Sequence, residues 1–151
     1  MLPSFKEKFT KVSASPTPAF PSRTSVLLPF VSIRLFNKDD QEKYIDLKAM
    51  LDSGAGLNIF PGEFGRGIGL SVINDRTEQI KGIGGQAFEG YVHDVILGVG
   101  GWKFNTYACF TFSEIACPVL GRDGFFNLFQ IKIDYLKNDM DFKAKAEPIK
   151  T

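Results

Sequence analysis

The sequence has little of several residue types on which enzyme chemistry often depends. Its 151 residues include one His and two Cys, and 18 Lys and Arg nearly balance 17 Asp and Glu. A single imidazole excludes schemes that need two histidines. His93, Cys109 and Cys117 together are too few soft ligands for a closed structural zinc site, so we expect no metal and no cofactor. Carboxylates remain as the main candidates for any catalytic chemistry.

The charge balance and the apolar runs exclude two kinds of partner. A formal net charge of +1 leaves no basic excess for a nucleic-acid backbone or an anionic membrane. No stretch approaches the ~20 apolar residues of a membrane span, because the most apolar segment, 25–36, contains Pro29 and Arg34. The first ten residues also lack the apolar run of a signal peptide. We therefore expect a cytoplasmic protein whose cysteines are reduced.

The N-terminal residues differ in composition from the rest of the chain. Residues 1–23 contain four prolines and several Ser and Thr, without sustained periodicity, which predicts a flexible Pro/Ser-rich leader. A hydrophobic content of 44% is enough for a core in the remainder. The predicted organisation is therefore a leader over 1–23, one domain over 24–146 and a C-terminal tail over 147–151.

The predicted domain has the pattern of β structure. Residues 26–36 and 44–51 alternate between apolar and polar positions around a polar turn, which predicts a hairpin. Glycine turns and further alternating runs continue this pattern, and 131–143 contains a last hairpin. Helix signals are weak, with one short helix expected over 123–129 and at most one turn near 62–69. These features predict an all-β fold that closes into a small barrel or sandwich.

Three short motifs stand out, and each has an ordinary structural interpretation when taken alone. Asp52-Ser53-Gly54-Ala55 places a carboxylate directly after an apolar strand, although Asp-Ser-Gly is also common in turns. Gly82-Ile83-Gly84-Gly85 has the composition of a hairpin turn. Val119-Leu120-Gly121-Arg122-Asp123 has the pattern of a strand followed by a helix. Their order and separations are hard to explain as coincidence.

In this order the three motifs resemble the signature of the retropepsin-like, or retroviral-type, aspartic proteases. That signature is a strand ending in Asp-Thr/Ser-Gly-Ala, a Gly-rich flap, and a Gly-Arg-Asp/Asn segment after two hydrophobic residues. The similarity extends from about Pro29 to Asp134 and is greatest to the cellular, bacterial-type members. It implies an all-β, small closed barrel of the retropepsin type, with one short helix after the Leu-Gly-Arg-Asp segment.

The resemblance also implies an aspartic endopeptidase that is active as a homodimer. Peptide hydrolysis by carboxylates needs two of them, one acting as a base toward water while the other is protonated. The chain contains one Asp-Ser-Gly, so Asp52 would meet its own copy across a twofold axis. The implied partners are a second copy and a peptide or protein substrate, with no nucleic acid and no membrane.

Other positions acquire roles from the same resemblance. Ser53 would form a hydrogen bond across the dimer axis, and Gly54 and Ala55 would support the active-site loop. The flap that closes over an extended peptide would consist of Gly82, Ile83, Gly84 and Gly85. Subsite-lining candidates are Leu57, Ile59, Val119 and Leu120, each of which is equally an ordinary core residue. Gly121, Arg122 and Asp123 would be structural residues beside the site.

The chain departs from the family pattern in places that leave alternatives open. Gly56 and Leu57 stand where many viral relatives carry acidic residues. Arg122 is therefore expected to pair with Asp123, Asp134 or a carboxylate of the partner. One alternative is a noncatalytic retropepsin-fold module for peptide binding or dimerisation. Another is that the leader over 1–23 is removed by self-processing.

Overall fold

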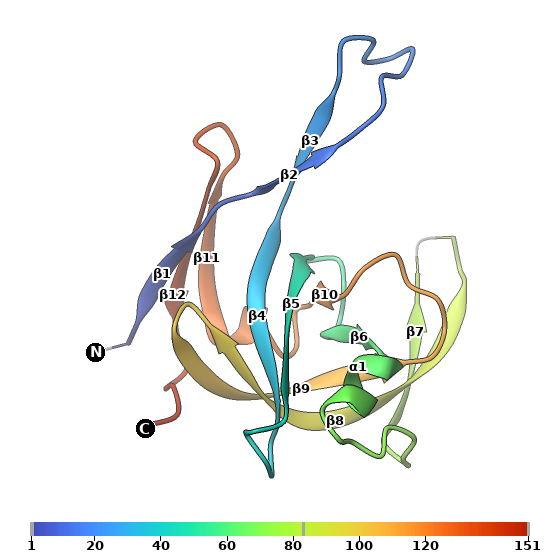
Figure 1. Cartoon of the computed structure of the whole chain (residues 1–151), viewed down its shortest axis with the longest axis vertical. Helices are drawn as coiled ribbons and strands as arrows, with labels where there is room; N and C mark the ends of the chain where they lie inside the picture. The colour runs from blue at the N-terminus through green and yellow to red at the C-terminus, as the bar shows by residue number, and fades with distance from the viewer. Residues whose placement is uncertain (1, 83, 151) are drawn as a thin grey trace.

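The computed structural model describes residues 2–82 and 84–150, and strands account for most of the regular structure (Figure 1). The elements in chain order are β1 (Ser4–Glu7), β2 (Thr10–Ser13), β3 (Ser25–Leu28), β4 (Phe30–Asn37), β5 (Tyr44–Leu51), β6 (Ile59–Pro61), α1 (Gly62–Gly67), β7 (Thr77–Lys81), β8 (Ala87–Val99), β9 (Trp102–Thr111), β10 (Val119–Leu120), the 3₁₀ helix η1 (Phe126–Leu128), β11 (Phe129–Asp134) and β12 (Asp139–Ala144).

The main sheet closes into a barrel. Its strand order is β4-β5-β10-β6-β9-β8-β7, and an additional antiparallel pairing between β4 and β8 joins the two sides. Strands β4, β5, β10, β6, β9 and β8 therefore form a closed ring, while β7 continues outward from β8. The predicted small closed barrel with an all-β fold is confirmed.

The β4–β5 hairpin follows the alternation in its sequence. Val31 and Leu35 on β4 are fully buried in the core, whereas Arg34 between them faces solvent. Arg34 lies opposite Asp46 on β5 and donates two hydrogen bonds to its carboxylate, at 2.6 and 2.9 Å. These bonds hold the pKa of Asp46 below its usual value. The register of the hairpin therefore fixes where β5 ends, with Met50 opposite Phe30 at the start of β4.

A second sheet joins the two ends of the chain, and it corrects the prediction of a flexible leader. Strand β1 pairs antiparallel with β12, with Phe5 opposite Phe142, and β12 pairs with β11. Strand β2 pairs with β3 in a separate two-stranded sheet. Residues 4–13 are thus ordered in strands, and the flexible-leader prediction is wrong for them. Because β1 pairs with a strand about 135 residues away, the sequence around β1 gives no local indication of this pairing.

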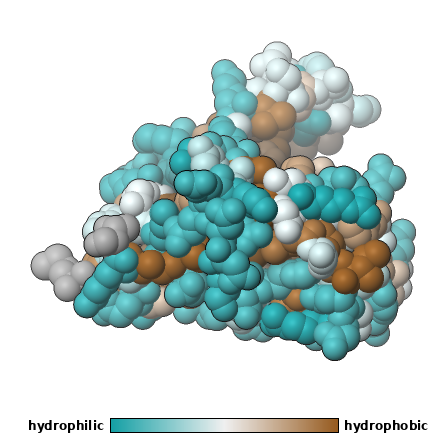
Figure 2. All heavy atoms as spheres, turned by 60° about the horizontal axis from the view of Figure 1, so that its bottom comes forward, coloured by the Kyte–Doolittle hydropathy of each residue, from teal (hydrophilic) through white to brown (hydrophobic). Residues whose placement is uncertain are grey.

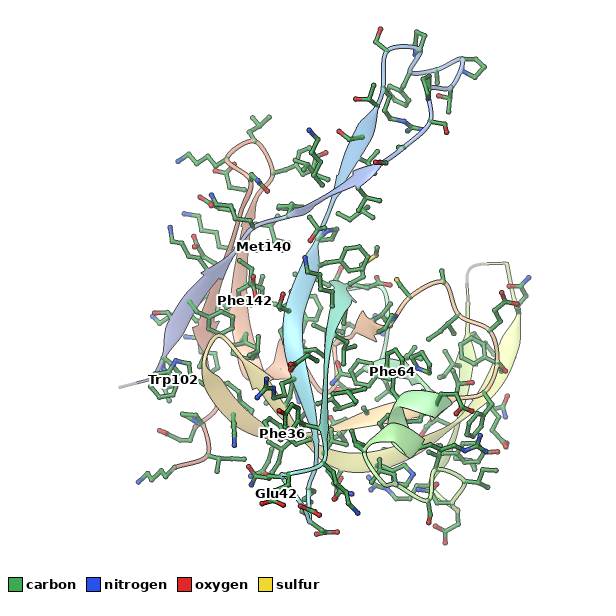
Figure 3. The ribbon with its side chains drawn as sticks, viewed as in Figure 1. Phe36, Glu42, Phe64, Trp102, Met140 and Phe142 are labelled. Atoms are coloured by element: carbon green, nitrogen blue, oxygen red, sulfur yellow. The ribbon has the colours of Figure 1, made fainter. Side chains whose placement is uncertain are left out.

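Aromatic packing holds this terminal sheet against the barrel. The ring of Phe5 stacks on Phe142 at 4.9 Å between centroids and meets Phe129 edge-on at 5.6 Å. Phe142 and Met140 on β12 are fully buried, and both are labelled in Figure 3. Phe125 meets Phe129 at 4.9 Å, which continues the cluster into the barrel. The terminal sheet therefore shares one hydrophobic core with the barrel.

The two helices are short, and neither resembles an independent helix. Helix α1 contains glycines where its backbone approaches neighbouring side chains, because a Cβ at Gly62 would collide with the Phe112 ring and one at Gly65 with the Val72 side chain. The helix predicted over 123–129 is present only as the three-residue η1. Among the described residues, none of the helices is long and apolar enough to cross a membrane.

Candidate active site

Asp52 lies where β5 leaves the barrel. The N–H of Leu51 donates to the carbonyl of Pro29 at 2.9 Å, and the N–H of Asp52 donates to the carbonyl of Leu120 at 3.0 Å. Strand β10 runs parallel to β5, with Leu120 beside Leu51. The backbone of Asp52 is thus fixed by neighbours on both sides, while its side chain is half-buried. An ionisable group at the end of a buried strand is typical of a functional loop.

The loop after Asp52 turns back on this carboxylate. The N–H of Gly54 donates to Asp52 Oδ1 at 2.9 Å, and the N–H of Ala55 donates to the Asp52 carbonyl at 3.1 Å. A Cβ at Gly54 would lie 3.1 Å from Oδ1, closer than an ordinary contact. A side chain at this position would therefore crowd the carboxylate, and glycine leaves room for it. Ser53 is exposed at the tip of the loop.

Arg122 supports the same loop from inside its own chain. Its Nη1 donates to the carbonyl of Ser53 at 2.9 Å. The backbone N–H groups of Arg122 and Asp123 donate to the carbonyls of Ala55 and Gly56, both at 2.9 Å. The sequence predicted a carboxylate partner for Arg122, whereas the hydrogen bond found for it goes to a backbone carbonyl. The Asp52 and Arg122 motifs, 70 residues apart, are thereby joined into one unit.

Asn58 is a site-supporting residue that the sequence analysis did not find. Its side chain is 1% exposed, accepts a hydrogen bond from the N–H of Gly121 and donates one to the carbonyl of Tyr107, both at 3.0 Å. The backbone of Gly121 also lies so close to the backbone of Leu57 that a Cβ at position 121 would collide with it. The available signal was a lone Asn inside the otherwise apolar run Leu57–Phe60.

The predicted flap is an antiparallel hairpin of β7 and the first half of β8. Its tip is closed by a hydrogen bond from the Gly82 N–H to the Gln86 carbonyl at 2.9 Å. Gly84 and Gly85 have φ angles of 98° and 83°, which strongly favour glycine. Ile83, predicted at the apex, lies outside the described residues. The hairpin tip and the end of β5 lie toward the same end of the barrel (Figure 1).

The four subsite candidates separate into two pairs. Leu120 and Ile59 are buried in the interior, where they behave as the core residues that the alternative interpretation described. Leu57 and Val119 are half-buried and keep some accessible surface. Val119 pairs with Met50 on β5, two residues before Asp52. Of the four candidates, Leu57 and Val119 are therefore the pair with surface available for a ligand in this conformation.

The two cysteines are free thiols in different surroundings. Burial raises the pKa of Cys109 to about 11, and the nearby Glu78 charge adds to this effect. Burial also raises the pKa of Cys117, with a further contribution from the charge of Asp52. Neither thiol is activated as a nucleophile. Across residues 2–82 and 84–150, no cluster of three His, Cys, Asp or Glu side chains could hold a metal ion.

The fold matches solved structures, two of which are described here. A retropepsin-like aspartic protease from Rickettsia conorii matches 95% of this chain and 97% of its own, with 15% identity and a TM-score of 0.53. An EIAV protease, solved as a complex with the inhibitor HBY-793, matches 63% of this chain and 82% of its own, with 20% identity and a TM-score of 0.49. No family model matches the chain, and no curated protein matches it.

The barrel, the Asp52 loop and the similarity to the Rickettsia structure define the class of fold. The chain has the retropepsin-like fold, as its three motifs predicted. At 15% identity this similarity establishes the architecture only.

Proposed function

We propose that this protein is an aspartic endopeptidase in which Asp52 of one chain and Asp52 of a second copy form the catalytic pair. The observation that carries the proposal is the half-buried Asp52 carboxylate, which receives the Gly54 N–H at 2.9 Å on a loop held by backbone hydrogen bonds. Such rigidity suits a catalytic group, because catalysis requires positioning before the substrate arrives.

A carboxylate pair provides the acid and the base for peptide hydrolysis. Two carboxylates at contact distance cannot both ionise, so the pair holds one proton. The ionised member takes a proton from water as the water oxygen attacks the peptide carbonyl carbon, and the protonated member gives its proton to the carbonyl oxygen. The resulting diol then collapses as the C–N bond breaks and the nitrogen takes up a proton. This proton comes from the carboxyl that took it from water, while the other carboxylate removes a proton from a diol hydroxyl as the C=O bond re-forms. The pair again holds one proton at the end of the cycle.

The rest of the site supports an extended peptide as the substrate. The β7–β8 hairpin with its glycine tip, Gly82, Gly84 and Gly85, has the form of a flap that opens and closes. Exposed Ser53, at the tip of the loop, is available to form a hydrogen bond across the dimer axis. Leu57 and Val119 supply half-buried apolar surface for substrate side chains.

The decisive experiment is the substitution Asp52→Asn in the full chain, assayed against an unstructured protein substrate such as denatured casein. We expect the cleavage rate to fall by at least about 10²–10⁴-fold, the usual contribution of a general acid or base. The melting temperature should stay close to that of the parent. Asp75→Asn, an exposed carboxylate in the loop before β7, is the matched control and should retain full activity.

The alternative function, a noncatalytic peptide-binding or dimerisation module, predicts a different result. In that case the parent protein would bind peptides without cleaving them, and Asp52→Asn would change nothing. Cleavage that is equal in the parent and in Asp52→Asn would instead show that another group or a contaminant is responsible. Either outcome would remove the assignment of Asp52.

A further inference from the structure

The hairpin of β2 and β3 with its connecting loop, residues 10–28, projects beyond the barrel; we refer to it as the arm. It forms a sheet of its own, with four residues in each strand, and pairs with no other strand. Figure 1 shows it extending past the end of the barrel toward which β5 runs. A two-stranded hairpin alone is marginally stable in water, so an arm of this kind needs a surface against which to pack.

We propose that the arm clasps a second copy of this chain and so brings two Asp52 loops together. This inference rests on the proposed function, because the catalytic pair is incomplete in one chain. The arm starts at the same place as the site: Pro29, the residue that follows β3, accepts the hydrogen bond from Leu51, the residue before Asp52. A partner that docks on the Asp52 loop therefore lies within reach of the arm.

The surface near Asp52 offers few apolar anchors for a dimer. Ser53, Gly54 and Gly56 are exposed but small. The chain termini do not provide an unpaired strand either, since β1 and β12 already pair with each other within one chain. A stable interface buries about 800 Å² on each partner, with large apolar or aromatic side chains at its centre. That contribution has to come from another element on this side of the molecule.

The arm and the turn beside it carry such side chains. Phe20 in the arm loop is 61% exposed, and Leu136 in the β11–β12 turn is 96% exposed. Between arm and turn lies a hollow of about 330 Å³, lined by Phe20, Leu27 and Tyr135 among others. In the space-filling view the arm stands away from the main body, with hydrophobic atoms near its base (Figure 2). Exposed apolar surface of this kind marks an interaction site.

The root of the arm is fixed, while its tip has few contacts with its own chain. Phe9 packs edge-on against Tyr135 at 5.3 Å, and its N–H donates to Asn138 Oδ1 at 2.9 Å. Within the loop, the Arg23 guanidinium donates to the Ser15 carbonyl and the Arg23 backbone N–H donates to the Phe20 carbonyl, so these bonds stay inside the arm. A fixed root and an exposed apolar tip suit an element that holds a neighbouring molecule.

Charge favours a second copy as the occupant. The arm contains Lys11 and Arg23 and no acidic residue. Beside the Asp52 loop, the exposed Asp123, whose N–H donates to the Gly56 carbonyl, adds a second carboxylate to Asp52, and these two face one cation, Arg122. Two copies related by a twofold axis would therefore each bring a basic arm toward an acidic surface of the partner. Each favourable contact would occur twice in such a dimer.

The first test replaces Phe20 with the photoreactive residue p-benzoylphenylalanine in the full chain. Illumination should give an adduct of twice the chain mass, in which position 20 is joined to another copy. The same replacement at Ile73, which is 65% exposed in the loop before β7, is the matched control and should give no adduct. Cross-links confined to one chain, or formed only with an added casein substrate, would overturn the clasp.

The second test measures the dimer dissociation constant of Phe20→Ser and Ile73→Ser by sedimentation at several concentrations. We expect Phe20→Ser to weaken dimerisation by about 10- to 100-fold, because an aromatic anchor is lost twice per dimer. Ile73→Ser should have no effect. An unchanged constant for Phe20→Ser would overturn the clasp.

The two proposals can fail separately. If the clasp is correct, concentrated Phe20→Ser should recover the cleavage rate of the parent, because Asp52 is untouched. If dimerisation depends on Phe20 but Asp52→Asn cleaves as the parent does, the proposed function fails while the clasp stands. If Asp52→Asn is inactive but Phe20→Ser leaves the dimer dissociation constant unchanged, the clasp fails while the proposed function stands.

Discussion

The contribution of strand β1 to stability can be tested by the substitution Phe5→Ala. The sequence assigned this residue to a flexible leader, whose substitution would have no effect. In the structure its ring stacks on Phe142 at 4.9 Å and meets Phe129 edge-on at 5.6 Å. The same ring lies against Gly100, where a Cβ would collide with it. Truncation of Phe5 therefore opens a gap between the terminal sheet and the barrel.

The magnitude follows from the area that is lost. A phenylalanine buries about 150–250 Å² when fully enclosed, and Phe5 is partly enclosed, so about half of this area is a conservative value. At about 25 cal/mol per Å², the loss of burial costs about 2–3 kcal/mol. The two aromatic contacts add on the order of 1 kcal/mol. For a chain of this length we expect the melting temperature to fall by roughly 6–15 °C.

The assay is thermal unfolding followed by far-UV circular dichroism, with Ser4→Ala as the matched control. Ser4 is on the same strand but is exposed on its opposite face, so its substitution should change the free energy of unfolding by less than about 0.5 kcal/mol. A Phe5→Ala variant that melts within 1 °C of the parent would refute the role of β1 and restore the flexible leader.

Two further predictions concern a buried and a half-buried polar group, Asn58 and Glu7. Asn58→Ala should lower the free energy of unfolding, measured in urea, by about 2–4 kcal/mol, because it leaves the Gly121 N–H and the Tyr107 carbonyl without their partner. The control Asn105→Ala, on the exposed face of β9, should leave the free energy of unfolding unchanged. Burial raises the pKa of Glu7 above 4.5, so stability falls as the pH rises through that raised value, and Glu7→Gln should melt above the parent at pH 7 but not below pH 4.5. An equal melting temperature at pH 7 would contradict the second prediction, and an Asn58→Ala variant as stable as the parent would contradict the first.

The elements that sequence predicted well are those specified by neighbouring residues. The β4–β5 hairpin shows alternation in both strands around a polar turn, and its register follows from that pattern. The closing hairpin of β11 and β12 is equally local, with Asn138 at a φ of 58° in its turn. The position of Asp52 at the end of β5 followed from the first of these hairpins.

The elements that sequence missed depend on distant partners. Strand β1 is four residues long, and its pairing with β12 is specified by Phe5 and Phe142 meeting in a shared core. The prolines before residue 23 suggested disorder, yet they lie mostly in the arm loop, outside the strands. Asn58 was missed for the same reason, because its importance comes from Gly121 and Tyr107, which are 63 and 49 residues away.

The closure of the core within one chain separates folding from assembly. The buried residues of the barrel and of the terminal sheet form a single cluster without help from a second molecule. A single chain therefore contains the whole hydrophobic core. It contains only one of the two Asp52 residues that the proposed catalytic pair needs. Dilution would then abolish cleavage at concentrations where the chain remains fully folded. Loss of activity in a variant such as Phe20→Ser therefore has to be compared with the loss on dilution of the parent before it is attributed to unfolding.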